Sequence, residues 1–296
     1  MSTTGGTKVL EPMELGIMTR HVERPSLEEV AVALRQYGLT AVQLSLESAG
    51  LDPLPERLTE EEARRIGEVF RAAGVRVAAV SGTFNVLDPD RERLRRNMER
   101  FARLCDACAW LGTRVVTTCT GTRNPDSMWR AHPDNQMPDA WAELLERTGE
   151  MAHAAERAGV MMAFEPETAN VVDTLEKAER LIETVGSPAV GVTFDPANFF
   201  YPRDLPRMQE VLEEGFRRLG KRIALAHAKD VVAPPDGGSH CRYSPAGRGL
   251  LDYETYLRLL RESGYANGLI MHSLSEADIP GCVGHLRQAG TATAQL

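Results

Sequence analysis

The sequence predicts one α/β domain with the architecture of a closed (β/α)8 barrel, the TIM-barrel fold. Apolar runs of strand length recur along the chain, and a helical stretch that ends in glycine precedes nearly every run. Eight such runs fit within the 296 residues, as a barrel of this kind requires. No G-x-G-x-x-G motif follows the first run, which argues against the open sheet of a dinucleotide-binding fold.

The eight strand candidates are nearly continuous apolar runs, the pattern typical of parallel strands covered on both faces. In chain order they are MELGIM (13–18), TAVQLSL (40–46), VRVAAVSG (75–82), TRVVTTCTG (113–121), VMMAFEP (160–166), AVGVTFDP (189–196), RIALAHAKD (222–230) and NGLIMHSL (267–274). A polar loop and a helical stretch follow each run, so we expect parallel strands with every connecting helix outside the barrel.

Capping residues mark the predicted helix boundaries. Glycines expected at the carboxyl ends of helices are Gly38, Gly74, Gly112, Gly159, Gly186, Gly220 and Gly264. Helix starts are predicted at two capping boxes, Ser26 with Glu29 and Thr59 with Glu62, and at the caps Asp90, Asp139, Thr174 and Asp252. The chain shows no linker or low-complexity stretch, so residues 13–296 are predicted to form one barrel and residues 1–12 a flexible N-terminal tail.

Net charge and hydropathy exclude several classes of protein. The formal net charge of −8 argues against a nucleic-acid binder, which needs a basic face. No apolar run reaches the length of a membrane span, and the N-terminus MSTTGGTKVLEPM lacks the basic-then-apolar order of a signal peptide. We therefore expect no nucleic-acid or membrane partner and a cytoplasmic location.

The five cysteines do not suggest a disulfide framework. Cys105 and Cys108 form a C-x-x-C pair, which is a motif of redox and zinc sites. The pair lies in a helical pattern, however, and no second such pair exists in the chain. We interpret these two residues as thiols of the core or of a helix surface.

Four ionisable residues lie at the ends of four consecutive strand candidates. Glu165, Asp195, His227 and His272 end the fifth to eighth runs, and these ends meet at the mouth of a (β/α)8 barrel. One aspartate after a strand is usually a helix cap, and one strand histidine is usually a core residue, but four together indicate a bound cation. Oxygen and nitrogen ligands favour Mn²⁺, Co²⁺ or Mg²⁺, with Zn²⁺ as a further candidate. We predict one divalent metal ion at this site.

The same strand ends offer candidate catalytic residues. A bound metal makes the C–H next to a carbonyl more acidic, and Glu165 or Glu167 could remove that proton if burial raises its pKa toward neutrality. Lys229 lies two residues after His227 and should face the same way on a strand. It could stabilise an enediolate or bind a phosphate; the alternative is a solvated lysine at a strand end.

Candidate substrate-binding residues lie in the neighbouring loops. The long segment TGTRNPDSMWRAHPDNQMPDAW after the fourth run offers an aromatic face for sugar C–H groups and hydrogen-bonding partners for hydroxyls. The substrate-binding candidates are Asn85, Arg123, Trp129, His132, Asn198 and Arg248. Trp129 has the alternative role of covering the mouth of the barrel.

Several motifs resemble the sugar isomerase/epimerase superfamily, whose members have a xylose isomerase-like barrel. The resemblance covers roughly residues 13–290 and rests on FEPE, FDPANFF, HAKD, GRGLLDYETYLRLLRESGY and GLIMHSL. It implies that Glu165, Asp195 and His227 are metal ligands and that a fourth ligand lies on the last strand. It also implies a homodimer or homotetramer.

Two residues depart from the pattern of this superfamily. Many members have a glutamate where this chain has His272. In the epimerases, that glutamate and the one on the fifth strand move protons on opposite faces of the substrate. Several ketose epimerases also have a histidine in place of Asn198, whose amide can hydrogen-bond a hydroxyl but does not titrate near neutral pH. The two-glutamate proton exchange is therefore an open question for this chain.

Several functions are compatible with these residues. The leading interpretation is a metal-dependent isomerase or epimerase acting on a small carbohydrate: a ketose, a keto-polyol or a sugar phosphate. A dehydratase or lyase acting on a keto-sugar or keto-inositol would use the same metal, and a barrel without chemistry would only bind a sugar. A DNA-repair endonuclease is disfavoured, because its cluster of zinc ions needs more ligands than this chain supplies.

Overall fold

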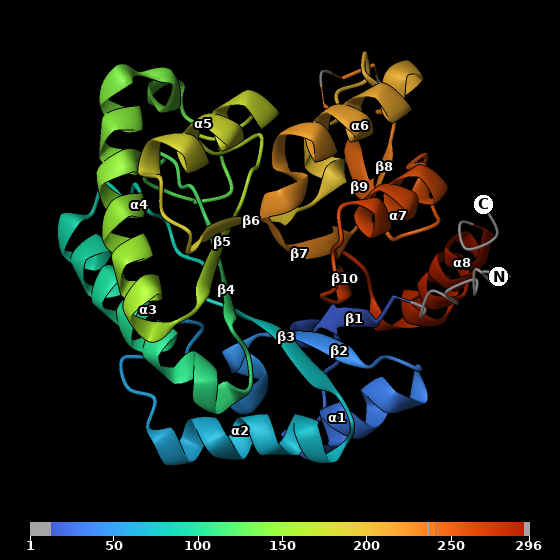
Figure 1. Ribbon diagram of the computed structural model, residues 1–296, viewed down its shortest axis with the longest axis horizontal. Helices are drawn as coiled ribbons and strands as arrows, with labels where there is room; N and C mark the ends of the chain where they lie inside the picture. Colours follow the sequence, from blue (N-terminus) through green and yellow to red (C-terminus); the bar gives the residue numbers. More distant parts are fainter. Residues whose placement is uncertain (1–12, 236, 239, 293–296) are drawn as a thin grey trace, which may run out of the picture.

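The centre of the molecule is a closed barrel of parallel strands (Figure 1). A computed structural model describes residues 13–235, 237–238 and 240–292. Around the barrel the strands follow the order β1-β10-β7-β6-β5-β4-β3-β2. Their bounds are β1 Leu15–Met18, β2 Ala41–Leu44, β3 Arg76–Ser81, β4 Val115–Cys119, β5 Met161–Glu165, β6 Val190–Phe194, β7 Ile223–Ala228 and β10 Leu269–Met271. The predicted (β/α)8 barrel is confirmed, and every barrel strand lies within its predicted run.

The helices form a ring outside the strands (Figure 1). Their bounds in the described part of the chain are α1 Leu27–Gln36, α2 Glu60–Ala72, α3 Arg91–Leu111, α4 Pro138–Ala158, α5 Leu175–Val185, α6 Met208–Leu219, α7 Tyr253–Glu262 and α8 Ile279–Ala292. Thr59 and Glu62 form the predicted capping box at α2. The prediction that Asp139 caps α4 is wrong, because Pro138 occupies the first helical position and Asp139 lies in the first turn.

Two hydrophobic clusters hold the fold together. The larger one packs the strands against the helices. The smaller one comes from barrel strands, so it fills the barrel interior; its buried members are Met18, Ala41, Ala78, Ala79, Leu225 and Ile270. Gly16 allows β1 and β2 to approach, because a Cβ there would lie 2.5 Å from the carbonyl oxygen of Ala41.

An additional hairpin lies between β7 and α7. Its strands are β8 (Asp230–Val232) and β9 (Arg242–Ser244), which pair antiparallel. The buried carboxylate of Asp230 accepts hydrogen bonds from the backbone N–H groups of Gly247 (3.0 Å) and Leu251 (2.8 Å). The carboxylate thus ties the base of the hairpin to the segment that leads into α7.

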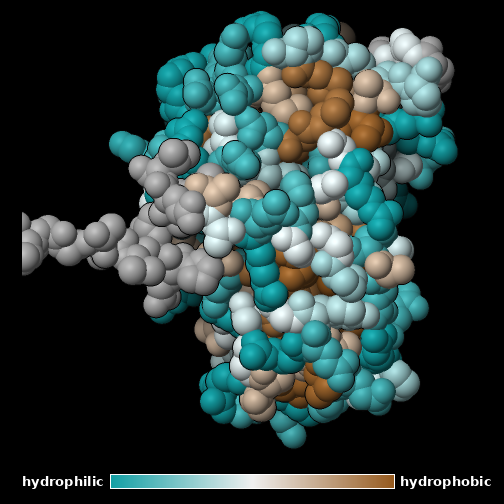
Figure 2. All heavy atoms as spheres, turned by 90° about the vertical axis from the view of Figure 1, so that its right-hand side faces the viewer, coloured by the Kyte–Doolittle hydropathy of each residue, from teal (hydrophilic) through white to brown (hydrophobic). Residues whose placement is uncertain are grey.

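The character of the surface and the burial of two cysteines agree with what the sequence predicts. Hydrophilic side chains cover most of the face that carries α7 and α8, and hydrophobic residues form separate areas between them (Figure 2). Within the described residues, no helix has both the length and the apolar character of a membrane span. Cys105 and Cys108 are free and buried in α3, as interpreted from the sequence. The predicted tail, residues 1–12, lies outside the described residues.

Candidate metal centre and active site

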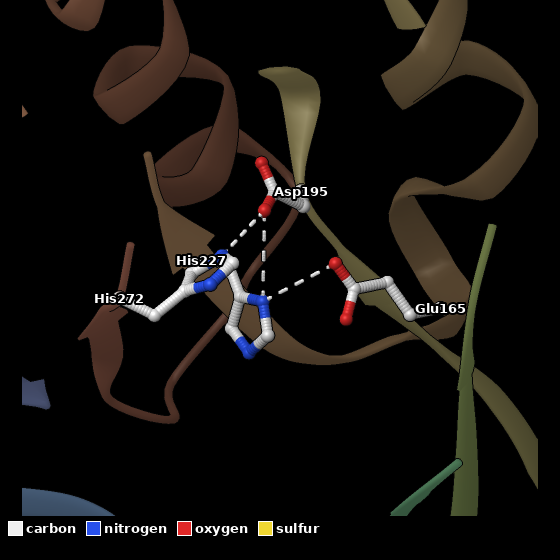
Figure 3. A group of neighbouring side chains, drawn as sticks. All are labelled: Glu165, Asp195, His227 and His272. Atoms are coloured by element: carbon white, nitrogen blue, oxygen red, sulfur yellow. Dashed lines mark hydrogen bonds and ion pairs between the residues drawn. The ribbon is translucent and has the colours of Figure 1, made fainter. Parts of the chain in front are cut away.

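Four side chains from four neighbouring strands converge at the carboxyl end of the barrel (Figure 3). Glu165 is the last residue of β5, Asp195 directly follows β6, His227 lies in β7, and His272 directly follows β10. One ligand atom from each residue lies within 4.8 Å of the others. Three of the side chains are buried, and that of Glu165 is 16% exposed.

The atoms of this cluster leave one imidazole nitrogen without a hydrogen-bond partner. His227 Nδ1 lies 3.6 Å from Glu165 Oε1 and 3.7 Å from Asp195 Oδ2, beyond hydrogen-bond distance, and is buried. His272 Nε2 lies 2.7 Å from Asp195 Oδ2. A buried polar atom without a partner is rare in folded proteins, so His227 Nδ1 is an atom that could bind a cation.

The two imidazoles differ in their protonation. Burial would lower the pKa of His227, but the negative charges of Glu165 and Asp195 outweigh it and raise this pKa to about 9. Burial and the positive charges of His227 and Lys229 lower the pKa of His272 to about 4. His272 is therefore neutral at physiological pH, the state in which an imidazole binds a metal.

The carboxyl groups also divide into two kinds. Burial would raise the pKa of Asp195, but Lys229 and the two histidines hold it well below its usual range. For Glu167, by contrast, burial and the charge of Glu165 raise the pKa to about 8. One carboxylate is thus permanently charged, while a second carboxyl group titrates near neutral pH.

The donor set fits a divalent cation. Two carboxylates and two imidazoles match the ligands that Zn²⁺, Mn²⁺ and Mg²⁺ accept in proteins, and His227 Nδ1 faces the two carboxylates. A thiolate does not take part, because burial raises the pKa of nearby Cys119 to about 12.

Lys229 lies beside the cluster and is 4% exposed, so it is not a solvated lysine. Its ammonium is 3.0 Å from Asp195 Oδ2 and donates a hydrogen bond of 2.8 Å to Asn198 Oδ1. The same ammonium lies 3.7 Å from the centre of the Tyr243 ring, a cation–π distance. Asn198 in turn donates a hydrogen bond to Glu165 Oε1 (2.9 Å), which links Lys229 to the fifth strand.

A cavity of about 470 Å³ lies over the cluster. Its floor includes Glu165, His227 and His272, and Glu167 lines its wall. Trp129, 53% exposed, also lines the cavity, as its predicted substrate-binding role requires. A larger cavity of about 730 Å³ lies between α2 and α3 at the opposite ends of the strands, away from these groups.

The other predicted substrate-binding residues lie outside the lining of the site cavity. Asn85 binds the backbone of Thr122 through both ends of its amide (2.9 Å each). Arg123 forms an ion pair with Glu143 at 2.8 Å.

His132 is held within its own loop, and Arg248 is held by the segment that leads into α8. His132 Nδ1 accepts a hydrogen bond from the backbone N–H of Asp134 (3.3 Å). The guanidinium of Arg248 lies 2.7 Å from Asp278. In this arrangement the two side chains fix the loops around the barrel mouth.

Two residues of the site were missed from the sequence. Gln43, in the middle of β2, is hydrogen-bonded to His227, and its only sequence signal is a polar residue inside an apolar run. Tyr243 lies on the hairpin strand β9, which no apolar run marks in the sequence.

Comparison with known proteins identifies relatives with this fold. A family model described as the xylose isomerase-like TIM barrel matches residues 31–281. An inosose isomerase from Bacillus velezensis is 26% identical over 226 residues, which cover 74% of this chain and 75% of the relative.

Two solved structures share the architecture. A xylose isomerase-like TIM barrel protein from Mycobacterium smegmatis, solved in complex with magnesium, is 18% identical with a TM-score of 0.71, covering 96% of this chain and 98% of that one. The probable 3-DHS dehydratase AsbF from Bacillus anthracis is 12% identical with a TM-score of 0.69, covering 94% and 99%. The match over residues 31–281 confirms the resemblance seen in the motifs, and the chain belongs to the xylose isomerase-like TIM barrel family.

Proposed function

We propose that this protein is a divalent-metal-dependent isomerase of a small carbohydrate, such as a ketose or keto-polyol. The observation that carries the proposal is the group of two carboxylates and two imidazoles under a cavity of about 470 Å³. A divalent cation held by Glu165, Asp195, His227 and His272 would polarise the substrate carbonyl and acidify the neighbouring C–H. The isomerase activity named for the Bacillus velezensis relative supports this reading.

Glu167 is the residue we propose as the general acid and base. Its pKa of about 8 lies near neutral pH, where one carboxyl group can both take and return a proton. It lines the cavity but is not one of the four ligand candidates. Glu165 accepts a hydrogen bond from Asn198 and faces His227, so its role is to hold the metal.

Lys229 would stabilise negative charge on the substrate oxygen. Burial would lower its pKa, but Asp195 and other carboxylates outweigh burial and raise it, so the side chain stays an ammonium. A fixed positive charge in a site shielded from water favours the charge that develops when a C–H next to a carbonyl loses its proton.

A dehydratase is the second candidate, because the candidate proton-transfer groups of the cavity lie on one side of it. Glu167 and Lys229 follow β5 and β7, whereas the charged residues of the opposite wall, Arg20 and Glu47, are exposed at the rim. Inversion of a carbon centre needs proton transfer on both faces of the substrate. Isomerisation and elimination can proceed with proton transfer on one face only. Since His272 stands in place of the glutamate of many relatives, the second proton-transfer group is also absent from this strand end.

The test is proton exchange in D₂O. The protein is stripped with EDTA, reloaded with Mn²⁺ and incubated with D-fructose, D-ribulose and 2-keto-myo-inositol, followed by mass spectrometry. Incorporation of one deuterium without a change in composition supports the isomerase, and loss of water supports the dehydratase. Metal binding without either result for any of the sugars would indicate a barrel that only binds sugars.

Further expectations accompany this proposal. Mn²⁺ is our first choice as the resident ion, and the cytoplasm and a homo-oligomer stay predictions. Trp129 is the proposed substrate contact, and Asn198 would hold Lys229 and Glu165 in place through its amide. Asn85, Arg123, His132 and Arg248 would support the loops that shape the cavity.

A further inference from the structure

Gln43 is a buried amide inside the barrel, and its partners come from three other strands. It lies in β2, whose four residues are all buried, and is itself 2% exposed. The side chain contacts Ser81 on β3, Thr117 on β4 and His227 on β7. Burying an amide is costly unless its hydrogen bonds are made, so these three partners are what allows Gln43 to be buried inside the barrel.

The partners give the two ends of the amide different roles. Gln43 Nε2 lies 3.0 Å from Ser81 Oγ and 3.1 Å from Thr117 Oγ1, so its two protons have two acceptors. Gln43 Oε1 is then left to face His227 Nε2 at 2.8 Å. An amide oxygen can only accept, so His227 Nε2 carries the proton of this hydrogen bond.

We propose that Gln43 is a positioning residue that keeps the proton of His227 on Nε2 and thereby leaves Nδ1 as the metal-binding atom. The proposal rests on the metal site of the proposed function. Its geometric support is that Nδ1 is the ring atom that faces Glu165 (3.6 Å) and Asp195 (3.7 Å) and has no hydrogen-bond partner. Partners of this kind fix the tautomer and the ring orientation of metal-binding histidines.

The reverse orientation of the amide has the opposite consequence. With its nitrogen toward His227, Gln43 would donate to Nε2, and the proton of a neutral ring would move to Nδ1. Nδ1 would then present a proton to the cation instead of a lone pair. In the observed orientation both amide protons are donated to the hydroxyls of Ser81 and Thr117, so the oxygen is the end of the amide that faces His227.

The tautomer can be read directly by NMR. In the ¹⁵N-labelled, metal-free protein at a pH where His227 is neutral, long-range ¹H–¹⁵N spectra show which ring nitrogen carries the proton, with His227→Asn for assignment. We expect a protonated Nε2 and an unprotonated Nδ1 in the wild type. A proton on Nδ1 would overturn the proposal.

Metal binding provides the second readout. Mn²⁺ titrations by calorimetry should show about 10- to 100-fold weaker binding in Gln43→Met, which keeps the length of the side chain but not its hydrogen bonds. Gln43→Glu should stay within about threefold of the wild type, because a carboxylate oxygen still accepts from Nε2–H. The control Gln209→Met removes an exposed amide on α6 that donates to Asp252, and it should bind Mn²⁺ like the wild type.

Each outcome has a defined meaning. Binding by Gln43→Met within twofold of the wild type would refute the positioning role. If Gln43→Met does not fold, Thr117→Val removes one acceptor of the amide and should still weaken Mn²⁺ binding; unchanged affinity would refute the role. If the wild type binds no divalent cation, the proposed function fails, and the NMR spectrum still decides whether Gln43 sets the tautomer.

Discussion

At the scale of single residues, the site depends on which atom each side chain presents. His272 Nε2 faces Asp195, and the hydroxyl of Ser273 lies 3.1 Å from the other ring nitrogen. Ser273 has a φ of 59°, a left-handed conformation that is costly for a residue other than glycine. The sequence placed His272 at the cluster through its position at a strand end. The sequence could not predict the conformation of Ser273, because serine rarely adopts a left-handed backbone and nothing in the neighbouring sequence marks one here.

Asp195 should be the ligand whose loss is most damaging, because its Oδ2 lies between His272, His227 and Lys229. Replacement by asparagine keeps the shape but removes the charge, so we expect Asp195→Asn to weaken Mn²⁺ binding by more than about 100-fold in calorimetry. The control Glu210→Gln, an exposed carboxylate on α6, should leave binding unchanged. Full occupancy in Asp195→Asn would exclude this site.

Glu167→Gln separates proton transfer from metal binding. The amide keeps the size of the side chain but cannot take a proton, so deuterium exchange into the substrate should fall by about 100- to 10,000-fold. Mn²⁺ affinity should change little, since Glu167 is not one of the four converging ligand candidates. Equal losses of affinity and exchange would instead place Glu167 among the metal ligands.

At the scale of elements, continuous apolar runs and glycine caps predicted all eight barrel strands, because buried parallel strands need apolar side chains on both faces. The hairpin of β8 and β9 was missed for a physical reason. Its strands have three residues each, and the side chains of β9 are largely exposed, so no apolar pattern marks them. Tertiary contacts hold it instead, through Asp230 and through Tyr243 over Lys229.

The hairpin should therefore protect Lys229 from solvent. The chain has four lysines: Lys8, Lys177, Lys221 and Lys229. In reductive methylation read by peptide mass spectrometry, Lys229 should react in Tyr243→Ala at least about tenfold faster than in the wild type, because the ring face is lost.

Tyr243→Phe is the matched control, because it keeps the ring face and should leave Lys229 protected. The methylation of exposed Lys221 serves as an internal standard, which shows that every sample received the same amount of reagent. Equal protection of Lys229 in Tyr243→Ala would show that the burial of the ammonium does not depend on the hairpin.

At the scale of the whole molecule, the two ends of the barrel have different chemistry. The carboxyl ends of the strands carry the buried ionisable cluster, whereas the cavity at the opposite ends is lined by surface ion pairs such as Arg71 with Glu68. This division is general in (β/α)8 barrels, where loops at the carboxyl ends carry function and the other end carries stability. Because this cluster forms only when the chain folds, a cation that binds it should raise the free energy of unfolding of the whole protein.

Metal removal should therefore lower the melting temperature. A cation at 100 times its Kd that binds only the folded state adds about 2.7 kcal/mol. For a chain of 296 residues this corresponds to a shift of about 5 °C, measurable by thermal scans with MnCl₂ or EDTA. Asp195→Asn should melt at the same temperature under both conditions; a full shift in that variant would place the stabilising ion elsewhere.

The affinity for the cation should also depend on pH, because protons compete for His227. Glu165 and Asp195 raise its pKa to about 9 in the metal-free protein, so below this pH the ring must release one proton to bind. Affinity should fall about tenfold per unit from pH 9 to pH 6 in calorimetric titrations. His272, with a pKa near 4, adds nothing in this range. A flat profile would contradict a charged His227, and a slope of about two below pH 8 would show that Glu167 also releases its proton when the cation binds.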